Sequence, residues 1–169
     1  MPKFTKPVLL GSQHNLTDFD CGKAELNSWL KSHALDKQNA MLSRTYVVES
    51  EGRVVGYYTL SHIDVKQGEP PKKFGRGMPS SIPSMLMARF AVDKACQGYG
   101  LGRSLYLDAL MRTWAVMDSG PAPVRLFVVD AMDDDALKFY ERFDMKPAPT
   151  NPYRLFLSYK DLRAIFKPD

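Results

Sequence analysis

A run of alternating glycines in the second half of the chain restricts the fold more than any other feature. Residues 97–103 read Gln-Gly-Tyr-Gly-Leu-Gly-Arg, and they join an expected strand over 84–92 to a long amphipathic helix. Alternating glycines let the backbone approach a ligand closely and point several N–H groups one way, and the start of a helix adds the positive end of its dipole. The segment is therefore suited to hold phosphates. The alternative is a glycine-rich turn without a ligand.

Two common nucleotide-binding motifs do not fit this segment. A Rossmann pattern, G-x-G-x-x-G, that starts at Gly98 needs a third glycine where Arg103 stands. A P-loop needs Gly-Lys followed by Ser or Thr, and that sequence is absent. Neither motif accounts for the glycines.

Apolar periodicity predicts helices and strands along the rest of the chain. Helical spacing predicts a helix from Leu26 to about Met41, either continuous or broken, with an N-cap region at Asp20. Two β-rich runs, 45–49 and 54–65, predict a hairpin, and Gly56 indicates a close backbone neighbour. The other expected elements, in chain order, are a long functional loop over 67–83, the strand over 84–92, a helix with Leu107, Leu110, Met111, Trp114 and Ala115 on one face, a strand over 124–129, a helix over 133–143, a strand over 154–159 and a turn of helix over 161–166. This order indicates an α/β or α+β sheet with helices on its faces.

Composition indicates one packed domain over residues 1–169. The chain is 44% hydrophobic and 25% charged, which excludes the class of disordered proteins. Its net charge of +4 permits a polyanionic partner without requiring one. The first residues lack the apolar core of a signal peptide, and no uncharged apolar run approaches the ~18 residues of a membrane span. We therefore expect a cytoplasmic protein without a membrane partner.

The histidines and cysteines give no sign of a metal site. His14, His33 and His62 are far apart in the sequence and have no metal-ligand spacing with Cys21 or Cys96. Two cysteines cannot form a disulfide framework, and as a nucleophile Cys96 lacks an evident histidine partner. We expect no metal.

The glycine segment and its flanks resemble a known family, the GNAT N-acetyltransferases. Arg-Phe-Ala-Val-Asp over 89–93, followed by Gln97-x-x-Gly100-x-Gly102, is similar to the end of a strand and the pyrophosphate loop of that family. The strand over 124–129 matches its next parallel strand, and Asp-x-x-Ala-x-x-Phe-Tyr-Glu over 133–141 resembles its N-x-x-A-x-x-F-Y-E helix. The resemblance implies a GNAT fold. Its central sheet would be mixed, mostly antiparallel and flanked by helices, and it would splay between the parallel strands at 87–92 and 124–129, where acetyl-CoA enters.

The resemblance also implies the residues of the site. It assigns contacts with acetyl-CoA to Phe90, Ala91, Val92, Gln97, Gly98, Tyr99, Gly100, Leu101, Gly102, Arg103, Asp133, Ala136 and Phe139. The backbone N–H groups of 90–92 can form an oxyanion hole for the thioester. Tyr140 occupies the position that commonly protonates the leaving thiolate, and a phenol with an ordinary pKa of about 10 stays protonated at neutral pH. The alternative for Tyr140 is a core aromatic packed with Ala136 and Phe143.

Two residues depart from the family pattern. Asp133 replaces the usual Asn, and a negative charge there suits a helix cap better than a place beside a phosphate. Asp144 stands where the family has a glycine, and Asp can adopt the left-handed conformation of that position at some cost.

Both ends of the chain narrow the resemblance to the toxins of type II toxin–antitoxin modules. The segments 19–22, 26–30, 43–48, 54–60 and 151–157 are similar to the corresponding segments of those GNAT toxins. They acetylate the α-amine of aminoacyl-tRNA, which blocks translation, and a cognate ribbon-helix-helix antitoxin neutralises them. The resemblance thus implies acetyl-CoA as cosubstrate, with aminoacyl-tRNA and an antitoxin as partners. No recognition-helix pattern carries a row of basic side chains, so we expect no DNA contact except through the antitoxin. The resemblance also implies a homodimer, a state common among similar toxins.

The acceptor side leaves alternatives open. Arg44, Lys72, Lys73, Arg76 and Arg89 are candidates for contacts with tRNA phosphates, or they are ordinary solvated surface residues. An esterified amino acid has a substantial neutral fraction of its amine, so no strong protein base is required, and no His or Glu base stands out. Two other functions compete: a GNAT enzyme that acts on a protein N-terminus or small amine, and an acyl-CoA-binding regulatory module without turnover.

Overall fold

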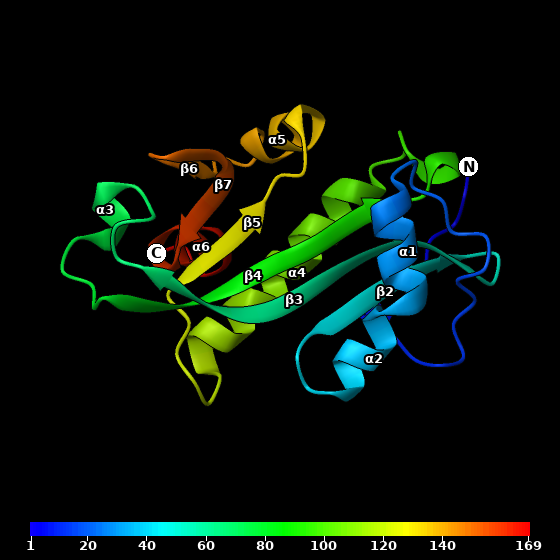
Figure 1. Ribbon diagram of the computed structural model, residues 1–169, viewed down its shortest axis with the longest axis horizontal. Helices are drawn as coiled ribbons and strands as arrows, with labels where there is room; N and C mark the ends of the chain where they lie inside the picture. Colours follow the sequence, from blue (N-terminus) through cyan, green and yellow to red (C-terminus); the bar gives the residue numbers. More distant parts are fainter. The chain divides into compact units, whose positions relative to one another are not determined.

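The computed structural model describes residues 1–169 and places seven strands among six α-helices and one short 3₁₀ helix. The elements, in chain order, are β1 Val8–Leu9, α1 Ala24–Ser32, α2 Ala34–Asn39, β2 Arg44–Ser50, β3 Arg53–Lys66, α3 Lys72–Gly75, β4 Ser81–Val92, η1 Lys94–Cys96, α4 Leu101–Ser119, β5 Leu126–Asp130, α5 Asp134–Glu141, β6 Lys146–Ala148, β7 Asn151–Ser158 and α6 Tyr159–Phe166 (Figure 1). The strands are hydrogen-bonded in the order β1-β2-β3-β4-β5-β7-β6. The sheet is mostly antiparallel, and β4 and β5 form its parallel pair. The expected mixed sheet flanked by helices is confirmed.

The chain divides into two compact units. Unit 1 consists of Met1–Ser61 and Ala88–Ala109, and unit 2 consists of His62–Met87 and Leu110–Asp169. The long elements β3, β4 and α4 each contribute residues to both units.

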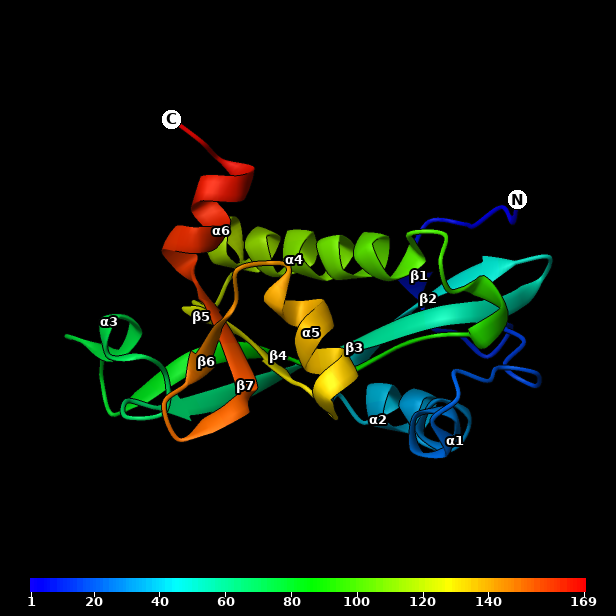
Figure 2. The same ribbon diagram turned by 90° about the horizontal axis from the view of Figure 1, so that it is seen from above.

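Unit 1 is built on the β2–β3 hairpin. Its two-residue turn, Glu51 and Gly52, has positive φ at both positions (51° and 76°), the geometry that continues the twist of a hairpin. Helices α1 and α2 cover one face of these strands, and the first half of α4 lies on the opposite face (Figure 2). A Cβ at Gly56 would lie 2.8 Å from Leu105 Cδ1 and 3.6 Å from the carbonyl oxygen of Ala91, so the nearest neighbour of this glycine is a side chain of α4 rather than the expected backbone.

The core of unit 1 lies under α1 and α2. Its buried members are Leu10, Phe19, Leu30, Ala34, Val47, Val54, Tyr57 and Ala91. The expected helix over 26–41 is broken at His33, and its N-cap is Lys23 rather than Asp20, because the Asp20 carboxylate is engaged elsewhere.

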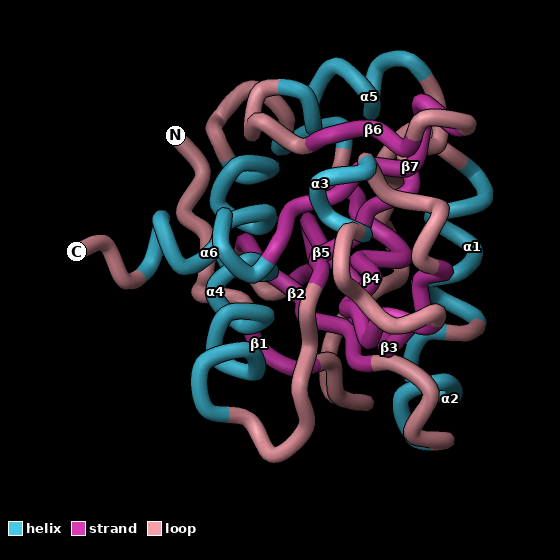
Figure 3. Tube along the Cα trace, turned by 90° about the vertical axis from the view of Figure 1, so that its left-hand side faces the viewer, coloured by secondary structure: helices cyan, strands magenta, loops and turns pink.

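Unit 2 contains the parallel pair and the C-terminal hairpin. Residues Ser84–Met87 of β4 pair with Leu126–Val129 of β5, and β7 lies between β5 and β6 (Figure 1). Helix α6 begins with a capping box of Ser158 and Asp161. It lies beside α4 (Figure 3), where Trp114 stacks on the rings of Tyr159 and Phe166.

Three expectations about elements are wrong in detail. The region 67–83 is not all loop, because it contains α3 and because β4 begins at Ser81. The buried face of α4 is Leu101, Leu105, Tyr106, Ala109, Leu110, Thr113 and Trp114, whereas Met111 and Ala115 are exposed. The apolar pattern misses this face because it includes a threonine and a small alanine. It also misses β1 and β6, which are too short to show an alternating pattern. No helix is both long and apolar enough to cross a membrane.

Candidate active site

The end of β4 forms one part of the candidate site in unit 1. Ala91 is buried in the core of this unit, and its neighbours Phe90 and Val92 are half-buried. Just after the strand, the backbone N–H of Asp93 donates to the carbonyl of Val55 at 2.8 Å. The strand therefore reaches the glycine segment from a fixed position.

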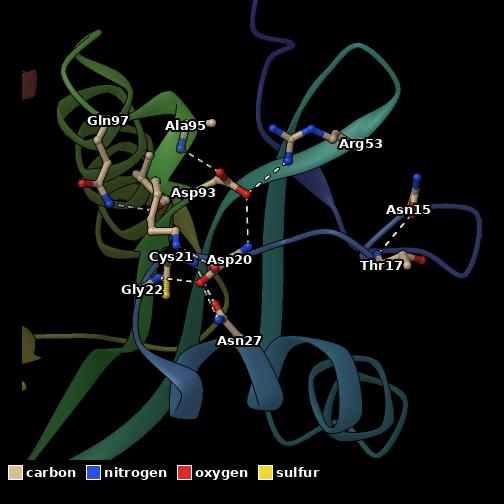
Figure 4. Close-up of polar contacts among 12 residues, drawn as sticks. Asn15, Thr17, Asp20, Cys21, Gly22, Asn27, Arg53, Asp93, Ala95 and Gln97 are labelled. Carbon is tan, nitrogen blue, oxygen red and sulfur yellow. Dashed lines mark hydrogen bonds and ion pairs between the residues drawn. The ribbon is translucent and has the colours of Figure 1, made fainter.

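The Asp93 side chain organises the turn that follows (Figure 4). The buried carboxylate accepts hydrogen bonds from the N–H of Ala95 at 2.9 Å, the N–H of Asp20 at 3.1 Å and the Arg53 guanidinium at 3.1 Å. Burial by itself raises the pKa of Asp93, but these hydrogen bonds outweigh it, and the pKa lies below its ordinary value. The first of them caps η1.

Asp20 joins the same turn to the N-terminal segment (Figure 4). Its carboxylate accepts from the N–H of Gly22 at 2.9 Å and from Asn27 Nδ2 at 3.0 Å, and it lies 3.0 Å from Lys94 Nζ. The hydrogen bond from Gly22, followed by those from Lys94 and Asn27, lowers the pKa of Asp20 to about 2. Two aspartates thus fix the chain ahead of α1 to the residues that lead into the glycine segment.

The glycine segment itself is exposed backbone ahead of a long helix. Residues 97–100 are all exposed, and Gly98 and Gly100 have φ of +85° and +80°. Helix α4 begins at Leu101, so its first N–H groups have no carbonyl one turn earlier. The Gln97 side chain donates to the carbonyl of Val92 at 3.1 Å, and in doing so it closes the segment against β4. Exposed N–H groups at the start of a 19-residue helix form a surface suited to phosphates.

Helix α5 carries the candidate aromatic residues in unit 2. Phe139 packs edge-to-face against both Tyr140 and Phe143, with ring centroids 5.4 and 5.2 Å apart. Tyr140 is only 4% exposed. Burial, and secondarily the charge of Asp130, raises the pKa of Tyr140 above its ordinary value. Its phenol is therefore fully protonated at neutral pH, as a proton donor must be.

Comparison with known proteins identifies the family. The model of the Acetyltransferase (GNAT) domain matches residues 42–144. A tRNA-acetylating toxin of Mycobacterium tuberculosis (strain ATCC 25618 / H37Rv) is 36% identical over 165 residues, which cover 98% of each chain. The chain belongs to the GNAT acetyltransferase family. The expected family, its fold and its acetyl-CoA-dependent class of reaction are thereby confirmed.

Solved structures of GNAT toxins are similar over almost the whole chain. AtaT complexed with acetyl-methionyl-tRNAfMet is 28% identical, with 98% of this chain and 100% of that chain covered and a TM-score of 0.85. A tyrosine-to-phenylalanine mutant of the AtaT toxin bound to the C-terminus of the antitoxin AtaR and to acetyl-CoA is 27% identical. That match covers 97% of this chain and 98% of the other, with a TM-score of 0.79.

The two departures from the GNAT pattern are accommodated by local structure. The Asp133 carboxylate accepts a hydrogen bond from the N–H of Ala136 at 2.9 Å and so caps α5, the alternative raised by its charge. Asp144 has φ of +58°, the left-handed conformation expected where the family has glycine.

The five basic candidates for tRNA contact lie in both units. Lys72, Lys73 and Arg76 are exposed and come from α3 and its C-cap in unit 2. Arg44 is exposed at the start of β2 in unit 1. Arg89 differs from the others, because it is half-buried and its guanidinium lies 5.1 Å from the centre of the Trp29 ring.

Sequence patterns miss two groups of acidic and basic side chains that interact with one another in the folded chain. Asp20, Asp93 and Arg53 meet in unit 1, and Glu69, Asp130 and Arg154 meet in unit 2. The register of β5 against β7 places Asp130 opposite Arg154, and no motif in the sequence encodes that register. No group of three or more His, Cys, Asp or Glu side chains gathers as metal ligands do.

Proposed function

We propose that this protein transfers the acetyl group of acetyl-CoA to the α-amine of an aminoacyl-tRNA, and that it is a toxin that blocks translation in the cytoplasm. The observation that carries the proposal is the 36% identity with a tRNA-acetylating toxin over 98% of both chains. The similar AtaT structures, which hold acetyl-methionyl-tRNAfMet in one case and acetyl-CoA with an antitoxin in the other, support the same donor, acceptor and partner. A cognate antitoxin would neutralise the toxin and provide any contact with DNA.

The donor would be held mainly by backbone groups. The N–H groups of residues 97–103 bind the pyrophosphate of acetyl-CoA, supported by the dipole of α4. The N–H groups of Phe90, Ala91 and Val92 stabilise the oxyanion that forms on the thioester carbonyl. Ala136 and Phe139 of α5 contribute further contacts with the cofactor. Residues 1–169 act as one acetyltransferase domain.

The transfer would need one proton donor. The neutral amine attacks the thioester carbonyl, a C–N bond forms, the C–S bond breaks, and the amine releases one proton. The departing thiolate takes a proton from the Tyr140 hydroxyl, whose raised pKa keeps it protonated until that step. Solvent then returns a proton to the phenolate.

A transfer assay tests this function directly. Labelled acetyl-CoA is incubated with the protein and with charged tRNA, uncharged tRNA, peptides with free N-termini, or polyamines. We expect label only on charged tRNA, and only in the α-amide. Label on peptides or polyamines instead would make the protein a GNAT enzyme of another acceptor class. Binding of acetyl-CoA without any transfer would indicate a regulatory module.

A further inference from the structure

Unit 2 contains a polar pocket of about 430 Å³, and none of its lining residues is among those that the family resemblance assigns to acetyl-CoA. Its polar lining comes from Glu69, Asp130, Thr150, Asn151, Tyr153 and Arg154. Asp130 is the last residue of β5, one strand of the parallel pair, and ligands of such sheets bind beyond the carboxyl ends of the strands. The volume falls in the usual range for small-molecule sites, roughly 300–1,000 Å³.

Arg154 is held in the wall of this pocket by two carboxylates. Its Nε and Nη2 donate to the two oxygens of Asp130 at 2.7 and 2.8 Å, and its Nη1 donates to Glu69 Oε2 at 3.2 Å. The Arg154 side chain is 23% exposed, and that of Glu69 is 35% exposed. The bidentate pair fixes the plane of the guanidinium, because two parallel hydrogen bonds permit only one orientation.

This network leaves a hydrogen-bond acceptor and hydrogen-bond donors unused on two residues that line the pocket. Glu69 Oε1 accepts no hydrogen bond, and Arg154 uses three of the five N–H groups of a guanidinium. Two carboxylates against one guanidinium leave one net negative charge in the lining. The pocket therefore offers an anionic acceptor for a cation and, beside it, cationic donors for a carbonyl oxygen.

The pocket and the proposed proton donor share a neighbouring carboxylate, that of Asp130. Asp130 lines the pocket, and the charge of the same carboxylate acts on the Tyr140 phenol. A group bound against Arg154 and Glu69 thus shares that carboxylate with the residue proposed to complete acetyl transfer.

We propose that this pocket binds the α-amino ester of the acceptor, with Glu69 Oε1 receiving the ammonium and Arg154 donating to the ester carbonyl. The ammonium then loses one proton to solvent, and the neutral amine that results attacks the thioester. An α-amino ester carries a cation and a carbonyl two bonds apart, which matches an acceptor and a donor that are themselves hydrogen-bonded to each other. Glu69 and Arg154 are then positioning residues that select charged over uncharged tRNA. This inference rests on the proposed function, but the chemistry it assigns to the pocket can be tested without turnover.

Binding of a small α-amino ester tests the pocket by itself. Methionine methyl ester and the corresponding hydroxy-acid methyl ester are titrated calorimetrically into the protein loaded with coenzyme A. We expect the amino ester to bind the wild type and to bind Glu69→Gln about tenfold more weakly, equivalent to ~1.4 kcal/mol. Glu69→Asp, which keeps the carboxylate, should restore part of the affinity. Glu25→Gln removes an equal charge from an exposed position on α1 and should change nothing. Equal binding of the two esters, or equal binding by wild type and Glu69→Gln, would overturn the proposal.

Kinetics with charged tRNA separate the pocket from the function. Glu69→Gln should raise KM for charged tRNA about tenfold, while KM for acetyl-CoA stays at the wild-type value. The effect should be the same for glycyl-, methionyl- and lysyl-tRNA, because the α-amine is common to all. An effect confined to lysyl-tRNA would assign the pocket to the amino-acid side chain and contradict the proposal. If the wild type does not acetylate charged tRNA, the proposed function fails, and the ester titration still decides the pocket.

Discussion

The candidate groups of unit 1 are exposed backbone N–H groups, whereas those of unit 2 are the side chains of Tyr140, Glu69 and Arg154. The backbone groups of 97–100 depend on conformation, and two glycines at positive φ together with the Asp93 network fix that conformation. The side chains of unit 2 depend on chemical identity, since another residue at the same place would lack the proton or the charge. Substitutions in unit 1 are therefore expected to affect binding and stability, and those in unit 2 to affect rate and acceptor choice.

The ionic networks of the two units also differ, in how far they are exposed to solvent and in how many hydrogen-bonding atoms they leave unused. Asp93 in unit 1 is 4% exposed, and its carboxylate accepts hydrogen bonds from two backbone N–H groups and Arg53, so it is shielded from a ligand in solvent. Arg154 and Glu69 in unit 2 are partly exposed, and each has hydrogen-bonding atoms that no protein group uses: N–H donors on Arg154 and Oε1 on Glu69. We therefore expect the buried Asp93 network to stabilise the fold, and the partly exposed Arg154–Glu69 network to be able to bind a ligand.

Replacement of Tyr140 should produce the largest effect. Tyr140→Phe removes the proposed proton donor but keeps the ring that packs against Phe139, so fold and acetyl-CoA affinity should be retained. We expect the rate of transfer to fall by roughly 100-fold or more, the usual contribution of general acid catalysis. Single-turnover kinetics at saturating acetyl-CoA measure this rate. A rate equal to that of the wild type would remove Tyr140 from the mechanism.

Removal of the Asp93 carboxylate should have the next largest effect, on stability. Asp93→Ala leaves Arg53 and two backbone N–H groups without their buried acceptor, and we expect a loss of about 1.5–3 kcal/mol in the free energy of unfolding at pH 7. Denaturant unfolding measures it. Asp64→Ala, at an exposed carboxylate of unit 2, should stay within about 0.5 kcal/mol of the wild type.

The same comparison predicts a dependence on pH. The pKa values of Asp93 and Asp20 are lowered in the folded protein, so the folded state binds fewer protons than the unfolded state when the pH is low. Their stabilisation is complete above the unfolded pKa of about 3.9 and declines as the pH falls from there toward 2. The difference in Tm between wild type and Asp93→Ala should therefore shrink over this window. A constant difference down to pH 2 would show that the charge of Asp93 does not stabilise the fold.

A glycine substitution in the loop should weaken acetyl-CoA binding more moderately. Gly100 has φ of +80° and open space around the position of a Cβ, so Gly100→Ala strains the backbone and places a methyl group where we propose that the pyrophosphate binds. We expect KM for acetyl-CoA to rise about tenfold. Gly52→Ala is the matched control, because that glycine has φ of +76°, is equally open and lies in the hairpin turn of the same unit. Equal effects of the two variants on KM would assign the loss to general strain.

The smallest expected effect concerns the basic residues of α3 and its C-cap. A triple variant tests them: Lys72→Gln, Lys73→Gln and Arg76→Gln together should weaken binding of charged tRNA. The slope of log binding constant against log salt concentration should become shallower by about 0.7–0.9 for each phosphate that these side chains neutralise in the wild type. Lys160→Gln, Arg163→Gln and Lys167→Gln remove the same charges from exposed positions at the C-terminal end of unit 2. Salt-titrated binding distinguishes the two triple variants. An unchanged slope in the first would leave its residues as ordinary surface.

Local patterns in the sequence predict one half of these features and miss the other. The positive φ of the glycine segment and of Asp144 follows from conformational rules that act on neighbouring residues. The family is predictable for the same reason, since its motifs are contiguous. The pairs Asp93–Arg53 and Asp130–Arg154 depend on strand register over 40 and 24 residues of sequence, and no local rule provides that register. The buried face of α4 is misjudged because Thr113, a polar residue, lies in it.

One measurement tests most directly whether unit 1 determines cofactor binding and unit 2 determines the rate. It is single-turnover acetyl transfer to charged tRNA at increasing concentrations of acetyl-CoA, with Tyr140→Phe and Gly100→Ala compared with the wild type. We predict that Tyr140→Phe lowers the saturating rate at an unchanged half-saturating concentration of acetyl-CoA. Gly100→Ala should raise that concentration and leave the saturating rate near that of the wild type. If both variants lowered the rate and weakened binding together, the loop and the tyrosine would not have separate roles, and the division would be contradicted.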